Sequence, residues 1–152
     1  MSSQTLSRTT DAQTTENGKA RYNTVMLIDD NSLDNFINKK LIESNGFAEK
    51  VNTYQEATEA LEFLKSCPRT EWPEVIFLDI NMPVMNGMEF MKELSQNEQY
   101  KTTPVIVVST EGSQERREEL MRSGVRAYLR KPVTPEGLVE TIGTVLGEEG
   151  AS

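Results

Sequence analysis

Three short runs of unbroken apolar residues constrain the fold of this chain more than any other feature. They occupy residues 25–28, 75–78 and 105–108, and a polar residue follows each run at once. Successive side chains of a strand point to opposite faces of a sheet, so an entirely apolar strand must be covered on both faces. Such strands are typical of parallel sheets packed between two layers of helices. We therefore expect these runs to be central strands.

Helical patterns separate the apolar runs and, with two weaker strands, complete a strand–helix alternation. The weaker strands are expected at residues 48–53 and 127–130. The helices are expected at residues 32–44, from 53–56 to 66, from near 87 to 94, at 113–123 and at 135–147. This alternation predicts an α/β fold with a doubly wound, mostly parallel sheet. In such sheets ligands bind beyond the carboxyl ends of the strands.

Local patterns sharpen the expectations for three of these helices. One face of the first helix is expected to carry five residues: Leu33, Phe36, Ile37, Lys40 and Leu41. Asn45 and Gly46 then give a stop signal. Residues 53–56 have the form of a capping box, which predicts that the second helix begins there. Thr134 and Pro135 combine an N-cap with a proline at the first position of the last helix.

The distribution of polar residues predicts one folded domain between two tails. Residues 1–23 are polar and rich in Ser, Thr and Gln, so we expect a disordered N-terminal tail. The folded domain is expected at 24–147, and residues 148–152 form a short C-terminal tail. Because the sequence ends at Ser152, just after the last helix, no separate output domain is expected.

Charge and composition exclude several function classes. The formal net charge is −8, which suggests neither a nucleic-acid nor a membrane partner. The chain has no histidine, so Ser-His catalysis, Cys-His catalysis and imidazole metal sites are excluded. Cys67 is the only cysteine, so no intrachain disulfide can form. This composition fits a reducing cytoplasm.

Polar residues gather where the expected strands end. Asp29 and Asp30 follow the first strand, Asp79 follows the third, Ser109 the fourth and Lys131 the fifth. Because the carboxyl ends of parallel strands lie at one edge of a sheet, these side chains are expected to converge there. Each also has a simpler interpretation, since the acidic pair could cap a helix, Asp79 could be a turn residue, Ser109 a loop hydroxyl and Lys131 a surface lysine.

The chemistry of this set points to a phosphoryl group. Three carboxylates in one place call for a cation, and oxygen ligands without His or Cys favour Mg²⁺, with Mn²⁺ as a near substitute. Lys131 adds a compact positive charge and Ser109 adds a hydroxyl donor. Such surroundings suit phosphoryl transfer to the Asp79 carboxylate, because the transferred group spreads negative charge over its oxygens.

Four motifs resemble the receiver domain of two-component response regulators. They are VMLIDDN, FLDINMPVMNG, PVIVVST and AYLRKPVTPEGL, in the order of that family, and the resemblance covers residues 24 to about 147. The chain is most similar to the single-domain kind, as in the chemotaxis response regulator. The resemblance implies a flavodoxin-like fold with five helices around a five-stranded sheet in strand order 2-1-3-4-5. It also implies a signalling switch that catalyses only its own phosphorylation and dephosphorylation, and no other enzyme activity.

The resemblance further implies a role for each motif residue. Asp79 matches the phospho-acceptor, Asp29 and Asp30 the acidic metal-binding pair, and the backbone carbonyl of Asn81 a further metal ligand. Ser109 and Lys131 match the residues that contact the phosphoryl group, and the bond between Lys131 and Pro132 is typically cis.

Four residues are expected to act in switching or in tuning the site. Ser109 and the aromatic Tyr128 match the pair that switches conformation. Thr110 stands where a smaller residue is common, so it is expected to modulate the site together with Asn81.

The resemblance also implies the partners. A histidine kinase or a histidine phosphotransfer protein would supply the phosphoryl group, and an unknown downstream protein would bind the fourth helix, last strand and last helix. Arginines gather on that surface: Arg116, Arg117, Arg122, Arg126 and Arg130. They suit an acidic partner or a second copy offering Glu136 and Glu140, in a monomer or a phosphorylation-dependent homodimer. A solvated face of mixed charge is the simpler interpretation.

Three other functions remain as alternatives. A phosphate-independent pseudo-receiver would act as a scaffold and would not accept a phosphoryl group. A haloacid-dehalogenase-type phosphatase would need a second Asp where Asn81 stands. A flavodoxin-like FMN protein would need a Ser/Thr-rich phosphate loop where Asp29 and Asp30 stand.

Overall fold

The computed structural model describes residues 22–79, 87–96, 103–110 and 114–150. Within these ranges, five strands alternate with five α-helices. The strands are β1 (Tyr22–Ile28), β2 (Ala48–Tyr54), β3 (Val75–Asp79), β4 (Val105–Ser109) and β5 (Ala127–Arg130). The helices are α1 (Ser32–Ser44), α2 (Ala57–Ser66), α3 (Gly87–Ser95), α4 (Gln114–Arg122) and α5 (Pro135–Gly150), and a 3-10 helix covers Arg69–Glu71.

All five strands form one parallel sheet in the order β2-β1-β3-β4-β5. The register pairs Leu27 of β1 with Phe77 of β3, and Phe77 with Ile106 of β4. The expected fold class is therefore confirmed: a doubly wound, flavodoxin-like sheet. Since every strand runs the same way, all five carboxyl ends lie at one edge.

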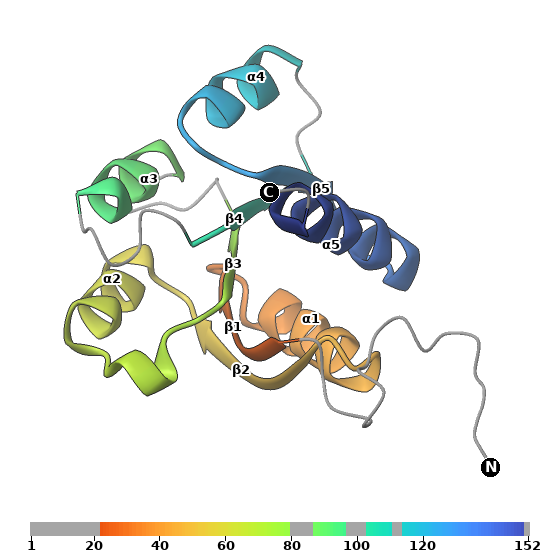
Figure 1. Ribbon diagram of the computed structural model, residues 1–152, viewed down its shortest axis with the longest axis horizontal. Helices are drawn as coiled ribbons and strands as arrows, with labels where there is room; N and C mark the ends of the chain where they lie inside the picture. The colour runs from red at the N-terminus through yellow and green to blue at the C-terminus, as the bar shows by residue number, and fades with distance from the viewer. Residues whose placement is uncertain (1–21, 80–86, 97–102, 111–113, 151–152) are drawn as a thin grey trace.

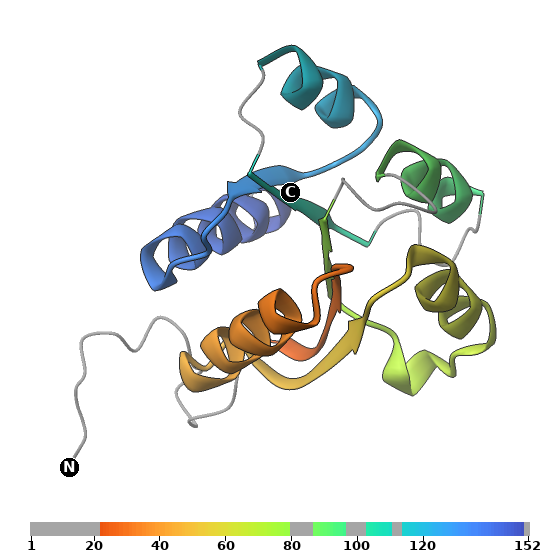
Figure 2. The same ribbon diagram turned by 180° about the vertical axis from the view of Figure 1, so that it is seen from behind.

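Helices cover both faces of the sheet. Figures 1 and 2 show α1 and α5 on one side and α2 and α3 on the other. Within β1, Met26 and Ile28 belong to the core on the α2–α3 side, whereas Val25 and Leu27 belong to the core on the α1–α5 side. Every side chain of the run is thereby buried, which stabilises the fold by about 1.5–3 kcal/mol for each large apolar residue. This explains why the runs are unbroken.

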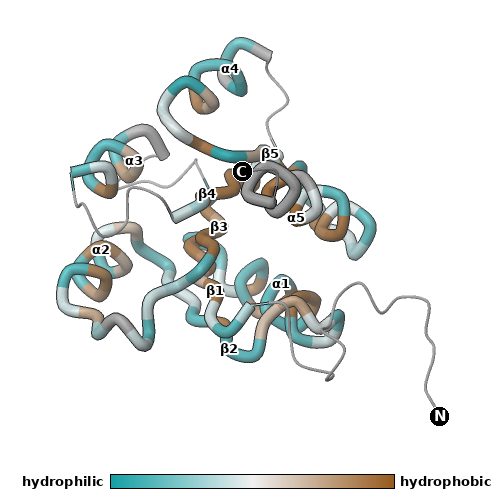
Figure 3. Tube along the Cα trace, in the orientation of Figure 1, coloured by the Kyte–Doolittle hydropathy of each residue, from teal (hydrophilic) through white to brown (hydrophobic). Residues whose placement is uncertain are grey.

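Helix α4 is the most hydrophilic helix around the sheet. Its tube is largely teal in Figure 3, whereas brown gathers on the strands. Leu120 is nevertheless fully buried and joins the core on the α2–α3 side, together with Val125 just after the helix. One buried leucine therefore attaches α4 while most of its surface faces solvent.

The first strand and the last helix are longer than the sequence predicts. Strand β1 begins at Tyr22, two residues before the expected boundary at Thr24, because Tyr22 packs in the α1–α5 core and its N–H donates to the Phe47 carbonyl at 2.9 Å. Helix α5 continues to Gly150, past the expected end at 147. The expected N-terminal tail up to residue 21 and the last two residues lie outside the described ranges.

The helix ends follow the sequence signals at two of three places. Gly46 has φ +73° just after α1, as the stop signal predicts. Thr134 caps α5, and its Oγ1 accepts a hydrogen bond from the Gly137 N–H at 3.0 Å. The prediction that a capping box at residues 53–56 begins the second helix is wrong. Thr53 is part of β2, where it pairs with Leu27, and α2 begins at Ala57 with no side-chain cap. Pairing with β1 extends the strand through the predicted cap.

The orientation of α1 corrects a second prediction. Three members of the expected apolar face are exposed: Leu33 by 62%, Phe36 by 59% and Ile37 by 49%. The buried residues of α1 are instead Asn35 and Ile42. The helix turns Asn35 inward because its amide bonds to the backbone beneath, so the Leu33–Phe36–Ile37 face points to solvent.

No helix within the described ranges is long and apolar enough to cross a lipid bilayer.

Candidate functional site

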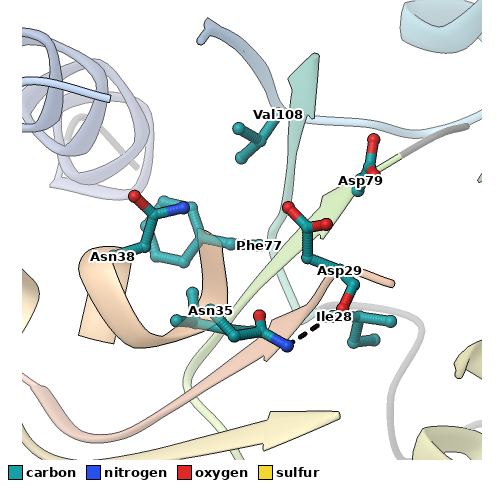
Figure 4. Close-up of a pocket in the computed structure, with 8 residues that line it drawn as sticks. Ile28, Asp29, Asn35, Asn38, Phe77, Asp79 and Val108 are labelled. Carbon is teal, nitrogen blue, oxygen red and sulfur yellow. Dashed lines mark hydrogen bonds between the residues drawn. The ribbon is translucent and has the colours of Figure 1, made fainter. Parts of the chain in front are cut away.

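Two buried carboxylates meet at the carboxyl edge of the sheet. Asp29 follows β1 directly and Asp79 is the last residue of β3, and they are 5% and 7% exposed. Asp30 is exposed beside them. One oxygen from each of the three lies within 4.8 Å of the others. Figure 4 shows Asp29 and Asp79 at their strand ends, with the apolar side chains of Ile28, Phe77 and Val108 lining the same pocket.

Local hydrogen bonds hold the turn between β1 and α1. The Asn31 N–H donates to Asp29 Oδ1 at 2.9 Å. The Asn31 side chain in turn caps α1, since its Oδ1 accepts hydrogen bonds from the N–H groups of Leu33 and Asp34 at 2.9 and 3.0 Å. An Asn at the N-cap is strongly preferred for this reason. The cap fixes where α1 begins and hence the direction of the Asp29 carboxylate.

Asn35 ties this turn to the neighbouring strand. Its buried side-chain amide donates to the Asp29 carbonyl at 2.9 Å and to the Tyr54 carbonyl at 3.1 Å. The first of these bonds is dashed in Figure 4. The Asp29 N–H also donates to the Tyr54 carbonyl at 3.0 Å. Asn35 therefore positions the backbone of Asp29 against the end of β2.

Lys131 connects the last strand to the carboxylates. Its Nζ lies 2.8 Å from Asp29 Oδ2, 3.0 Å from Asp34 Oδ2 and 3.8 Å from Asp79 Oδ2. Burial acts to lower the pKa of Lys131. The hydrogen bonds to Asp29 and Asp34 and the negative charge of Asp79 outweigh it, so the pKa lies above its ordinary value. Lys131 is thus a firmly protonated cation within a group of acids.

The backbone delivers Lys131 and Ser109 to the same edge. The Lys131 N–H donates to the Ser109 carbonyl at 2.9 Å, and the bond between Lys131 and Pro132 is cis, as expected from the resemblance. Ser109, the last residue of β4, is fully buried. Thr110 follows it in an exposed bend. The structure therefore brings Ser109 and Lys131 to the strand ends where Asp29 and Asp79 lie.

Tyr128 lies within β5, three residues before Lys131, and contacts α4. It is half-buried, packs against the α2–α3 core and pairs with Val107 of β4. The guanidinium of Arg117 lies over its ring, with 5.4 Å between Cζ and the ring centroid. This contact links α4 to the strand that directly precedes Lys131.

The remaining expected residues are placed as follows. Arg122 and Arg130 are exposed, and Arg126 is half-buried. Asn81 lies outside the described residues, and so does the side chain of Arg116.

Two residues of the site were not predicted from the sequence. Asp34 lies on the first turn of α1 and its carboxylate binds Lys131; its place five residues after Asp29 was the available signal, because a first-turn residue faces the strand end. Asn35 is a polar residue on the buried side of a helix. A polar side chain on the buried face of a helix could have indicated a structural role, because buried polar groups need hydrogen-bond partners.

The geometry suits a hard cation next to a nucleophilic carboxylate. The acidic group offers only oxygen donors, which are the ligands that Mg²⁺ prefers. Two of the three acids are buried, so their repulsion in a region of low dielectric is strong, and Lys131 offsets only part of it. The residues present therefore fit a divalent cation.

Comparison with known proteins identifies the family. The model of the response regulator receiver domain matches residues 25–143. The polar-differentiation response regulator DivK of Brucella ovis is 32% identical over 124 residues, which cover 82% of this chain and 96% of DivK.

Solved structures agree with this match. The chemotaxis response regulator CheY4 of Vibrio cholerae is 33% identical with a TM-score of 0.68, covering 82% of this chain and 98% of CheY4. A two-component response regulator from Cytophaga hutchinsonii is 26% identical with a TM-score of 0.73, covering 82% and 97%. With the motifs on the strand ends and the parallel 2-1-3-4-5 sheet, these matches show that the chain belongs to the response regulator receiver domain family.

Proposed function

We propose that this protein is a phosphorylation-activated switch that accepts a phosphoryl group on Asp79 and signals by contact with another protein. One observation carries the proposal. The buried Asp79 carboxylate has two acids within 4.8 Å and the Lys131 ammonium at 3.8 Å. This arrangement places a nucleophile where both a divalent cation and a lysine can neutralise an arriving phosphoryl group.

The proposed reaction moves a phosphoryl group from nitrogen to oxygen. An Asp79 oxygen forms a bond to the phosphorus of a phosphohistidine while the phosphorus–nitrogen bond breaks. The imidazole keeps the electron pair of that bond and takes a proton from solvent. The product is an acyl phosphate on Asp79. Attack by water on phosphorus later returns the carboxylate and releases inorganic phosphate. The chain acts on no other substrate.

Ser109 and Lys131 are proposed to contact the phosphoryl oxygens. Lys131 is a protonated donor within 4 Å of Asp79, and the Ser109 hydroxyl belongs to the next strand end. Thr110 is proposed to modulate access to the site, because it is the exposed residue directly after Ser109. The side chain of Asn81 is proposed to act in the same way.

Asp29, Asp30 and Asp79 are proposed to hold Mg²⁺, with Mn²⁺ as a substitute and the Asn81 carbonyl as a further ligand. All the donors are oxygens, which matches the preference of both ions. When bound, the ion would neutralise negative charge on the phosphoryl oxygens. The residues of the chain orient the acceptor, exclude water and supply the lysine.

The phosphoryl donor is proposed to be a histidine kinase or a histidine phosphotransfer protein. We place its docking surface on the exposed Leu33–Phe36–Ile37 face of α1. This face adjoins the site, because Asp34 on the same helix turn contacts Lys131. A protein carrying the phosphohistidine must approach this edge of the sheet, and an exposed apolar face beside it provides contact area.

A double variant, Leu33→Glu with Phe36→Glu, tests the docking surface. We expect transfer from the phosphorylated kinase or phosphotransfer protein to slow by at least about tenfold, since charge replaces apolar contact. Phosphorylation by a small acyl-phosphate donor should be unchanged, because that donor needs no docking surface. Met121→Glu on α4, which is 43% exposed, is the matched control. Equal slowing with both donors would contradict the assignment.

The output is proposed to pass through α4, β5 and α5. Ser109 and Tyr128 would switch together, since Tyr128 packs beneath α4 and against the strand that ends in Ser109. A second phosphorylated copy is the partner that we propose. Its Glu136 and Glu140 would meet the arginines of this surface, which carries Arg122 and Arg130 exposed, Arg126 half-buried and also Arg116.

Sedimentation of the phosphorylated chain measures this association. We expect Arg122→Glu to weaken self-association by about tenfold, because it places like charges opposite each other. An unchanged dissociation constant, or a wild-type chain that stays monomeric after phosphorylation, would argue against a second copy as the partner.

A reducing compartment such as the cytoplasm suits this chain, because Cys67 is a free thiol.

The proposed function is tested by the intact-protein mass after incubation with Mg²⁺ and a small acyl-phosphate donor. A gain of one phosphoryl mass that EDTA prevents supports the switch. No gain from either the small donor or a phosphorylated partner would support the pseudo-receiver instead.

A further inference from the structure

Among the described residues that contact Lys131, Asp34 is the one that no role in phosphoryl transfer explains. Its Oδ2 accepts a hydrogen bond from Lys131 Nζ at 3.0 Å, close to the 2.8 Å of the bond to Asp29. The distance from Nζ to Asp79 Oδ2 is 3.8 Å, which exceeds hydrogen-bonding distance. The ammonium therefore donates hydrogen bonds to the acids of the β1–α1 segment, whereas its contact with the acceptor Asp79 is a longer ion pair.

A divalent cation bound to Asp29, Asp30 and Asp79 would change which carboxylates hold the Lys131 ammonium. A divalent cation on Asp29 would compete with Lys131 for the same carboxylate. Among the described residues, Asp34 is then the carboxylate that still lies within hydrogen-bonding distance of the ammonium. The Asp34 side chain is 36% exposed, compared with 7% for Asp29, so water can readily replace Lys131 there. Such a contact can hold the lysine and still release it.

We propose that Asp34 competes with the phosphoryl group for the Lys131 ammonium and thereby slows phosphorylation of Asp79. In the unphosphorylated chain, Asp34 keeps Lys131 directed toward α1. Once a phosphoryl group is on Asp79, its oxygens attract the ammonium and the bond to Asp34 breaks. Asp34 is thus a positioning residue for Lys131. This inference rests on the proposed function, because it assigns the competitor of the same transfer step.

Asp34→Asn tests the competition by its effect on rate. The amide keeps the size of the side chain but offers only a neutral acceptor, which binds an ammonium less strongly than a carboxylate does. We expect phosphorylation by a small acyl phosphate in the presence of Mg²⁺ to be about fivefold faster than in the wild type. Glu59→Gln is the matched control: it removes one exposed carboxylate from helix α2 and should leave the rate unchanged.

A zero-length carbodiimide cross-link tests the contact without any phosphoryl group. This reagent joins an amine to a carboxylate that touches it, with loss of water. Trypsin cleavage after Arg130 releases residues 131–152, in which Lys131 is the only lysine. Asp29, Asp30 and Asp34 all lie on the peptide of residues 22–39, so fragmentation of the cross-linked pair identifies the joined acid.

We expect Mg²⁺ to shift the Lys131 cross-link from Asp29 to Asp34, and addition of the acyl phosphate to reduce the Asp34 cross-link. A faster Asp34→Asn chain together with this shift supports the competition. A rate equal to or below that of the wild type, or no cross-link to Asp34 with Mg²⁺, overturns it. A wild-type chain that never gains phosphoryl mass overturns the proposed function, and the two failures are therefore distinguishable.

Discussion

Asp79→Asn is expected to abolish phosphorylation of the chain, with a loss of at least about 1000-fold in rate. The amide fills nearly the same space as the carboxylate but is a very poor nucleophile, so no acyl phosphate can form at that position. The equal size of the two side chains matters because Asp79 is only 7% exposed at the end of β3. The measurement is the intact-protein mass after incubation with Mg²⁺ and a small acyl phosphate.

The control for this result is the stability of the folded chain. Replacing one of three neighbouring carboxylates removes repulsion, so the thermal midpoint of Asp79→Asn should not fall below that of the wild type. A folded variant without phosphoryl gain identifies Asp79 as the acceptor. Phosphoryl gain at the wild-type rate would move the acceptor to another carboxylate, and the proposed reaction would fail.

Lys131→Met is expected to change two properties in opposite directions. The rate of phosphorylation should fall about 100-fold, because a donor that stabilises the transferred group is lost. The affinity for Mg²⁺ should rise by up to about tenfold, because the lysine at 2.8 Å no longer competes for the Asp29 carboxylate. Rates come from the intact mass and Mg²⁺ affinity from titration of the free protein.

Lys65→Met supplies the matched control, since it removes a positive charge from the exposed side of α2. Neither property should change in that variant. A slower rate with unchanged Mg²⁺ affinity would show that Lys131 does not compete with the ion. An unchanged rate would remove Lys131 from the transfer step.

The fold was largely predictable because the sheet is buried on both faces. Residues 75–78 contain no polar side chain, and that pattern distinguishes a central parallel strand from a half-exposed one. The edge strand β2 was harder to delimit, since only Ala48 and Val51 of its seven residues are buried. Its pairing with β1 carried the strand through Tyr54, against the local capping signal at residues 53–56.

The positions of the main site residues were also predictable. Asp79 follows an apolar run with no intervening loop, so its position depends only on the strand. Asp34 and Asn35 were missed because their roles depend on how α1 is rotated. That rotation follows from hydrogen bonds of Asn35 to two carbonyls, that of Asp29 six residues before it and that of Tyr54 nineteen residues after it, at the end of β2.

The sequence by itself determined the order of the elements, the parallel sheet and the meeting of Asp29, Asp79 and Lys131 at one edge. These follow from local patterns, because the apolar runs leave each strand a single way to be buried. Only the tertiary structure decided which face of α1 reaches solvent and which acids hold Lys131. Helical periodicity places residues on a common face, but the contacts of that face are chosen by the surfaces that pack against it.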